Sequence, residues 1–268
     1  MVTFTVLGNE LIGTFATSTK IQMWRAGSIS KFTREIGLVL KAIGVGKIRG
    51  TRLPEDMSCR EQAEQIREGL FENSEINFDQ FQEIVFIPDG PLWYLPFELL
   101  PFPGHATDLL IDRVKIRYAP TPGFALKPDE DRAQNDQKFA LAADLFFAPR
   151  DLDQNNALID QLANLVPDTL RLPGSFQSAS SFLGDSISDL VVAKPQFVNP
   201  KQPLAFYPAA YDQANPMGTL QAWLRFPLNA PERIVLAGLR TSVDGGSMGN
   251  GTELFHTLCA LHCSGVGE

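Results

Sequence analysis

Alternation of apolar and polar positions at the start of the chain predicts a β-hairpin. Residues 2–7 alternate valine and phenylalanine with threonine, which is typical of a strand with one buried face. The Gly8-Asn9 pair that follows is a turn signal, and residues 11–16 supply the partner strand.

Two stretches further along the chain repeat their apolar residues with helical spacing. In residues 31–43 the apolar positions fall on one helical face, and Ser30 is the expected cap. Residues 59–70 form a second stripe, in which Cys59 falls on the apolar side and is expected in the core. We therefore expect residues 1–79 to be a strand-hairpin and helix segment that packs on the rest of the chain.

From residue 81 onward, short runs that are apolar on both faces alternate with turns and helices. Such runs suit strands that are covered by helices on both sides. The expected strands are residues 84–87, 114–118, 141–147, 190–193 and 234–239, and the expected helices are residues 155–166, 177–182 and 252–262. The predicted class is α/β, with a mostly parallel central sheet flanked by helices.

Composition narrows the classes of partner and the compartment. The 268 residues are 44% hydrophobic and 20% charged, which is enough apolar material for a sizeable core. A net charge of −8 repels phosphate backbones, so we expect no nucleic-acid partner. No apolar run approaches the roughly 20 residues of a membrane span, and the N-terminus lacks the pattern of a signal peptide. Three unevenly spaced cysteines indicate reduced thiols and a cytoplasmic protein, and no cofactor is indicated.

The most informative segment is residues 87–100, whose sequence is IPDGPLWYLPFELL. It combines a buried strand, an Asp-Gly turn and an aromatic plug, after which Pro96 can start a short helix that contains Glu98. This segment resembles the opening motif of the CHAT domain family, whose members have a caspase-like fold and often follow tetratricopeptide repeats.

The resemblance extends along residues 80–265 and implies a caspase-like sandwich core over residues 80–268. Relatives continue into a further strand and helix, whereas this sequence stops at Glu268. The core is therefore expected to lack its last strand and helix. A sheet edge left unpaired in this way can accept a strand from a partner chain.

The catalytic pair of the family is missing from the matching positions. In active relatives a histidine takes the thiol proton, and the thiolate attacks the scissile carbonyl. The stretch that resembles the histidine strand, residues 189–197, contains no histidine, and the dyad position falls near Lys194 or Gln196. Leu239 stands where relatives place the cysteine, and Arg240 stands where they place an acid. The resemblance therefore implies a catalytically inactive pseudo-peptidase.

Binding is the function that such a cleft retains. The candidate cleft residues are Lys194, Arg240, Thr241 and Asp244, whose two basic members suit an acidic peptide segment or a regulatory loop. We therefore expect a protein-interaction or regulatory module whose partner is a protein or peptide segment.

Two other chemistries stay open near the end of the chain. One is an active cysteine peptidase of the family with a displaced or non-standard pair, drawn from His256, Cys259, His262 and Cys263. The other is a metal site, since His256, Cys259 and Cys263 share one helical face, although no fourth ligand is evident. Small, buried cysteines in a close helix–sheet contact are the favoured interpretation. The glycine-rich residues 245–251 lack the ending of a phosphate loop, and we expect a flexible loop over the cleft.

Overall fold

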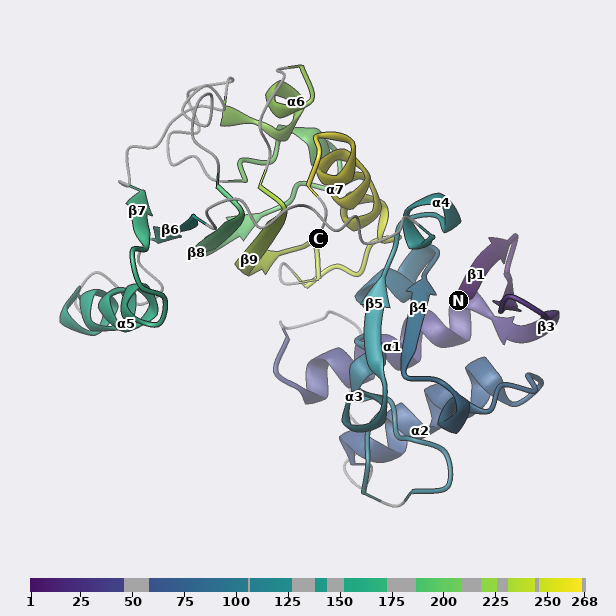
Figure 1. Ribbon diagram of the computed structural model, residues 1–268. Helices are drawn as coiled ribbons and strands as arrows, with labels where there is room; N and C mark the ends of the chain where they lie inside the picture. Colours follow the sequence, from purple (N-terminus) through teal and green to yellow (C-terminus); the bar gives the residue numbers. More distant parts are fainter. Residues whose placement is uncertain are drawn as a thin grey trace. The chain divides into compact units, whose positions relative to one another are not determined.

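The computed structural model divides the chain into two compact units (Figure 1). The first unit consists of Met1–Pro128 and Ser242–Phe255, and the second unit consists of Asp129–Thr241 and His256–Glu268. Each unit has its own sheet and its own hydrophobic core. The structure describes residues 1–45, 58–105, 107–126, 138–143, 152–172, 187–208, 218–225, 231–243 and 246–266.

The sheet of the first unit is mixed, and its strand order is β3-β2-β1-β4-β5. The strands are β1 (Val2–Leu7), β2 (Glu10–Ala16), β3 (Ile21–Ser28), β4 (Glu83–Ile87) and β5 (Lys115–Tyr118). The predicted hairpin is confirmed, because β1 and β2 pair antiparallel along their whole length. β4 pairs in parallel with both β1 and β5. Because β1 and β4 share one sheet, the compact units do not follow the division expected between residues 79 and 80.

Both helices expected near the start of the chain are present in the first unit. They are α1 (Ile29–Ala42) and α2 (Cys59–Phe71). The cap prediction for α1 is wrong: β3 runs directly into the helix, Ser28 occupies the cap position, and the Ser30 hydroxyl donates to Asn9 Oδ1 at 2.6 Å instead. At the start of α2, Ser58 Oγ accepts the backbone N–H of Glu61 at 3.2 Å. Cys59 is partly buried and packs against the core, as its place in the stripe predicts.

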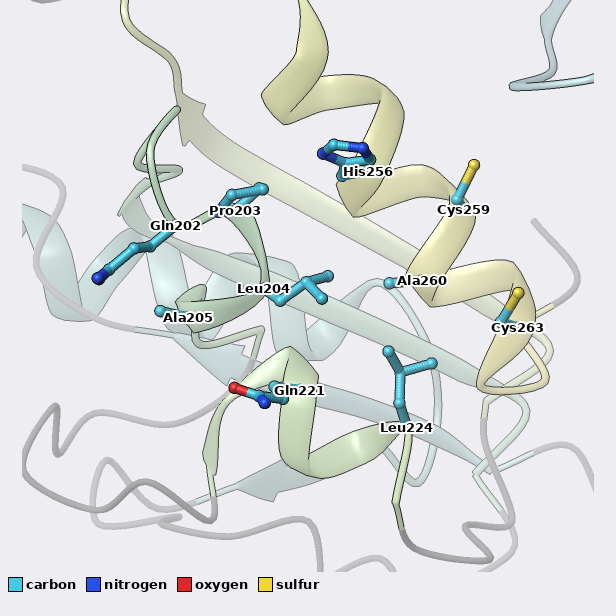
Figure 2. A pocket seen from close by; sticks show the side chains of 10 residues that line it. All are labelled: Gln202, Pro203, Leu204, Ala205, Gln221, Leu224, His256, Cys259, Ala260 and Cys263. Atoms are coloured by element: carbon cyan, nitrogen blue, oxygen red, sulfur yellow. The ribbon is translucent and has the colours of Figure 1, made fainter.

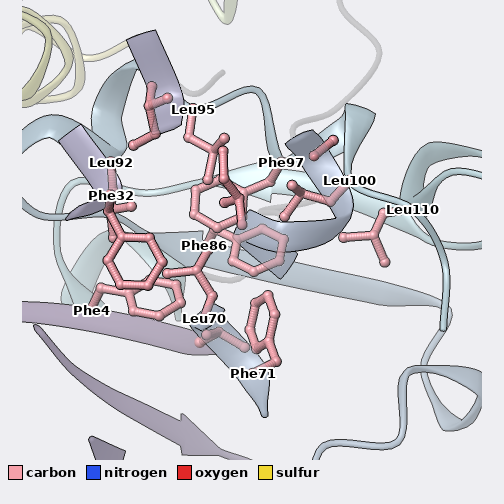
Figure 3. Packing of buried hydrophobic residues seen from close by; sticks show 14 of the residues in the cluster. Phe4, Phe32, Leu70, Phe71, Phe86, Leu92, Leu95, Phe97, Leu100 and Leu110 are labelled. Carbon is pink, nitrogen blue, oxygen red and sulfur yellow. The ribbon is translucent and has the colours of Figure 1, made fainter. Parts of the chain in front are cut away.

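Aromatic rings fill the space between this sheet and its helices. Phe97 stacks on Phe86 with ring centroids 4.2 Å apart and on Phe4 at 5.9 Å (Figure 3). Phe32 from α1 and Leu70 from α2 complete the same buried cluster. Because full burial of one such side chain contributes about 1.5–3 kcal/mol, this cluster is a main source of the unit's stability.

Residues 87–100 begin at the last residue of β4 and pack against this core. Asp89 fixes the turn, since its Oδ2 accepts the Val6 N–H and its Oδ1 accepts the Gly90 N–H, both at 2.8 Å. Gly90 takes the left-handed conformation, with φ of 58°, that suits glycine best. The expected plug is confirmed: Leu92, Tyr94, Leu95 and Phe97 are all buried.

The short helices of the unit are η1 (Phe78–Gln80), η2 (Gly90–Tyr94), η3 (Phe97–Leu99), α3 (Leu110–Arg113) and α4 (Pro122–Ala125).

The described strands of the second unit are all parallel, in the order β7-β6-β8-β9. They are β6 (Phe139–Ala143), β7 (Leu170–Leu172), β8 (Asp189–Phe197) and β9 (Arg233–Arg240). The helices are α5 (Leu152–Asn164), η6 (Pro203–Ala205), α6 (Leu220–Trp223) and α7 (Thr252–Cys263), whose first four residues belong to the first unit. The helix expected at residues 177–182 lies outside the described residues.

Alternate side chains of the central strands pack on opposite faces of this parallel sheet. On one face, Leu190 and Val192 of β8 join a cluster that contains Trp223 of α6 and Leu261 of α7. On the other face, Ala193 packs in a cluster to which α5 contributes. The predicted α/β class, with a parallel sheet flanked by helices, is therefore confirmed, although the strands form two sheets rather than one central sheet.

Candidate functional site

The carboxyl ends of β8 and β9 bring together two positions at which the sequence resemblance predicts the catalytic pair of the CHAT family. In the parallel register, Gln196 lies opposite Leu239 and Phe197 lies opposite Arg240. Residues paired across a ladder project their side chains to the same face of a sheet. The amide of Gln196 and the isobutyl group of Leu239 are therefore neighbours at this strand end.

A β-bulge comes directly before this pair. Between Ala193 and Gln196, β8 has two residues, Lys194 and Pro195, where β9 has only Gly238. A bulge suits Pro195, which has no N–H to give to a ladder, and Gly238 takes a φ of 99°. Bulges are frequent beside active sites because they redirect a side chain, and this bulge sets the direction of Gln196.

Gln196 is held by the backbone that follows η6. Its side chain is 6% exposed, and its Nε2 donates to the carbonyl oxygen of Pro208 at 2.6 Å and points at that of Tyr207 at 3.4 Å. Its Oε1 is buried without a hydrogen-bond partner among the described residues. Leu239 packs against the apolar cluster on the same face of the sheet. An amide has no titrating proton near neutrality and a leucine has no nucleophile, so these two side chains cannot carry out acyl transfer.

Of the four expected cleft residues, the structure places the side chains of only two. Arg240 is exposed at the end of β9, where its carbonyl oxygen accepts the Val198 N–H at 2.9 Å. Thr241 follows and is partly buried. Lys194 lies in the bulge, with its side chain outside the described part, and Asp244 lies outside the described residues altogether. The cleft prediction therefore rests on Arg240 and Thr241.

His256, Cys259 and Cys263 share one face of α7, as expected, but the interpretation as buried cysteines is wrong for Cys263, which is exposed, whereas Cys259 is partly buried. All three line one pocket of about 740 Å³ together with residues of η6 and α6 (Figure 2). Within the described ranges, no group of three or more His, Cys, Asp or Glu side chains is arranged to hold a metal ion. The metal site therefore gains no support from this geometry.

The thiol of Cys259 is in an environment that disfavours its reactive form. Burial raises the pKa of Cys259, and the neighbouring Cys263 raises it further. A nucleophilic cysteine needs the opposite shift, since the thiolate is the attacking species. This direction argues against Cys259 as a displaced catalytic nucleophile.

A polar network around Glu253 in the first unit was not expected from the sequence. Glu253 is fully buried, and its Oε1 accepts the Tyr94 hydroxyl at 2.5 Å and the Ser242 hydroxyl at 2.8 Å. The Tyr94 oxygen in turn accepts the Gly251 N–H at 3.2 Å. Burial, reinforced by Glu253, raises the pKa of Tyr94 to about 12. The only signal in the sequence is an acidic residue in the first turn of an otherwise apolar helix.

Part of the glycine-rich loop packs on the plug of the first unit, because Gly249 and Gly251 both lie close to its side chains. The predicted flexibility of residues 245–251 stays a prediction. A Cβ on Gly251, which has a φ of 74°, would lie 2.4 Å from the carbonyl oxygen of Gly90 and 2.7 Å from Trp93 Cβ. A Cβ on Gly249 would lie 2.8 Å from the Tyr94 hydroxyl oxygen. The glycines therefore allow close packing of the chain on itself.

Comparison of the chain with protein-family models and with curated proteins gives no match. Among the described residues, no helix combines the length and the apolar character that a membrane crossing requires. The functional argument therefore starts from the geometry of the chain itself.

Proposed function

We propose that this chain is a catalytically inactive, CHAT-like and caspase-like domain that acts by binding another protein. The observation that carries the proposal is the pairing of Gln196 with Leu239 at the ends of two parallel strands. An active relative would hold its imidazole and its thiol there. Here the amide is engaged by backbone carbonyl groups, and its neighbour is a hydrocarbon.

β9 supplies the surface for a partner strand. It is the last strand in the sheet order, and within the described part of the chain it pairs only with β8. The opposite edge, β7, has three residues, whereas β9 has eight. Val235, the third residue of β9, is 54% exposed. A long edge with exposed apolar side chains is the kind that accepts a strand from another chain.

The charge at the end of β9 indicates what such a partner carries. Arg240 is exposed beside the paired positions. An acidic side chain that follows the partner's pairing strand would lie beside this guanidinium, and arginine suits carboxylates because of its planar array of donors. The proposed partner is therefore a protein segment that pairs with β9 and presents an acidic residue to Arg240.

Light scattering tests whether the exposed edge of β9 can pair with another strand, and it requires no knowledge of the natural partner. An unprotected edge pairs with copies of itself, so we expect the mass of the purified chain to rise with concentration. Val235→Lys places a charge on the edge and should hold the mass at that of a monomer. Leu165→Lys is the matched control, because Leu165 is 74% exposed in the same unit and lies outside every strand. A wild-type chain that stays monomeric at all concentrations would argue against the edge.

Fluorescence anisotropy with labelled acidic peptides tests whether the charge of Arg240 contributes to binding. We expect an acidic β-strand peptide to bind the wild-type chain and the Arg225→Glu variant, but not the Arg240→Glu variant. Arg225 is also exposed in the second unit, so the two variants change the net charge equally. Equal binding by both variants would refute the assignment to Arg240.

A further inference from the structure

The pocket beside α7 is a feature that the proposed binding edge does not use. Its volume of about 740 Å³ lies within the roughly 300–1,000 Å³ range of pockets that hold small ligands. Its walls come from three helices of the second unit, namely η6, α6 and α7 (Figure 2). A site built on helices that pack against a sheet has a defined shape before any ligand arrives.

The described walls of the pocket are mostly apolar, and His256 is their one basic side chain. None of the ten described residues around the pocket is a lysine, arginine, aspartate or glutamate. Pro203 and Leu204 from η6 and Leu224, directly after α6, supply apolar surface. Gln202 and Gln221 supply uncharged hydrogen-bonding groups. A charged ligand would lose hydration without gaining a permanently charged partner from these residues.

The wall formed by α7 adds two thiols. Cys259 and Cys263 are one helical turn apart, and Figure 2 shows both sulfur atoms on the same side of α7. Both cysteines are free, and the raised pKa of Cys259 keeps its thiol in the neutral form at ordinary pH. A neutral thiol behaves as a small apolar group, so Cys259 adds apolar surface to a wall that also carries His256.

We infer that this pocket is a binding site for a neutral, largely apolar small molecule. The apolar body of the ligand lies against Leu204 and Leu224, and its polar end is held by the amide side chains at the rim. The inference rests on the pocket and its lining, and it does not depend on the role proposed for β9.

Titration with Nile red, a neutral apolar dye, tests the site on the full chain. We expect saturable binding of one dye per chain. Leu224→Lys and Ala205→Lys each place a charge on a different wall, and each should weaken dye binding at least tenfold. Both positions are exposed, Leu224 by 40%, so these changes leave the core of the unit intact. Leu165→Lys, away from the pocket, should bind the dye as the wild type does.

The three cysteines provide a second readout in the same molecule. Bound dye should slow the modification of Cys259 and Cys263 by N-ethylmaleimide, followed by mass spectrometry. It should leave the rate at Cys59 in α2 unchanged. Absence of saturable dye binding, equal affinity of the wild type and both pocket variants, or equal slowing at Cys59 would each overturn the inference.

Discussion

Replacement of Tyr94 by phenylalanine removes one hydroxyl from the network around Glu253 and leaves the ring in place. That hydroxyl donates to Glu253 Oε1 at 2.5 Å and accepts the Gly251 N–H at 3.2 Å. A hydrogen bond contributes about 1 kcal/mol when both groups are neutral and about 1.5–3 kcal/mol when one is charged. The carboxyl group stays buried with one donor fewer. We therefore expect Tyr94→Phe to lower the free energy of unfolding of the first unit by about 2–4 kcal/mol.

Equilibrium unfolding in urea, followed by tryptophan fluorescence, measures this loss. Ser242→Ala supplies the partner for a double-mutant cycle, because the Ser242 hydroxyl donates to the same oxygen at 2.8 Å. Groups that share one acceptor should deviate from additivity by about 0.5–3 kcal/mol. A loss below about 0.5 kcal/mol for Tyr94→Phe, or additive effects of the two changes, would refute the reasoning about this network.

Three further predictions concern the packing, the titration and the paired positions. Gly251→Ala forces a methyl group towards a carbonyl oxygen at 2.4 Å and should cost at least about 2 kcal/mol in thermal unfolding; an unchanged midpoint would contradict the close packing. Burial raises the pKa of Tyr94 to about 12 and also raises the pKa of Tyr118. The folded protein therefore holds both phenolic protons more tightly than the unfolded chain, and this contribution to stability is intact below pH 10 and is lost as the pH rises above it. Phenolate absorbance should show two late-ionising tyrosines, and each Tyr→Phe variant should remove one. The double variant Leu239→Cys/Gln196→His should react with iodoacetamide about tenfold faster than the single variant Leu239→Cys, because a neighbouring imidazole lowers the pKa of a thiol. Equal rates would mean that the two side chains are not in contact.

Local patterns were sufficient to predict most of the elements. The hairpin of β1 and β2 and the helices α1, α2, α5 and α7 follow from alternation or helical spacing. β3 was not predicted, because Ile21 and Met23 are apolar yet 75% and 68% exposed, which removes the alternation. Its pairing with β2 determines the strand instead. The division into two sheets was also not predicted, since strand pairing between distant segments has no local signature.

The candidate site was predictable in part. The resemblance to the CHAT family placed the dyad positions near Lys194 or Gln196 and at Leu239, and the structure pairs Gln196 with Leu239. The bulge before Gln196 depends on the register of two strands, which the sequence does not specify. The network around Glu253 joins residues that are 148 and 159 positions apart in the chain. No pattern within a helix or strand could have indicated contacts at that separation.

The most direct test of an inactive domain is an assay for peptide hydrolysis. Purified chain would be incubated with a fluorogenic peptide library under reducing conditions, beside the Cys259→Ala and Cys263→Ala variants. The account predicts no hydrolysis above the buffer rate for any of the three proteins. Hydrolysis by the wild type that is lost in either variant would contradict it, because a remaining thiol would then be acting as the nucleophile.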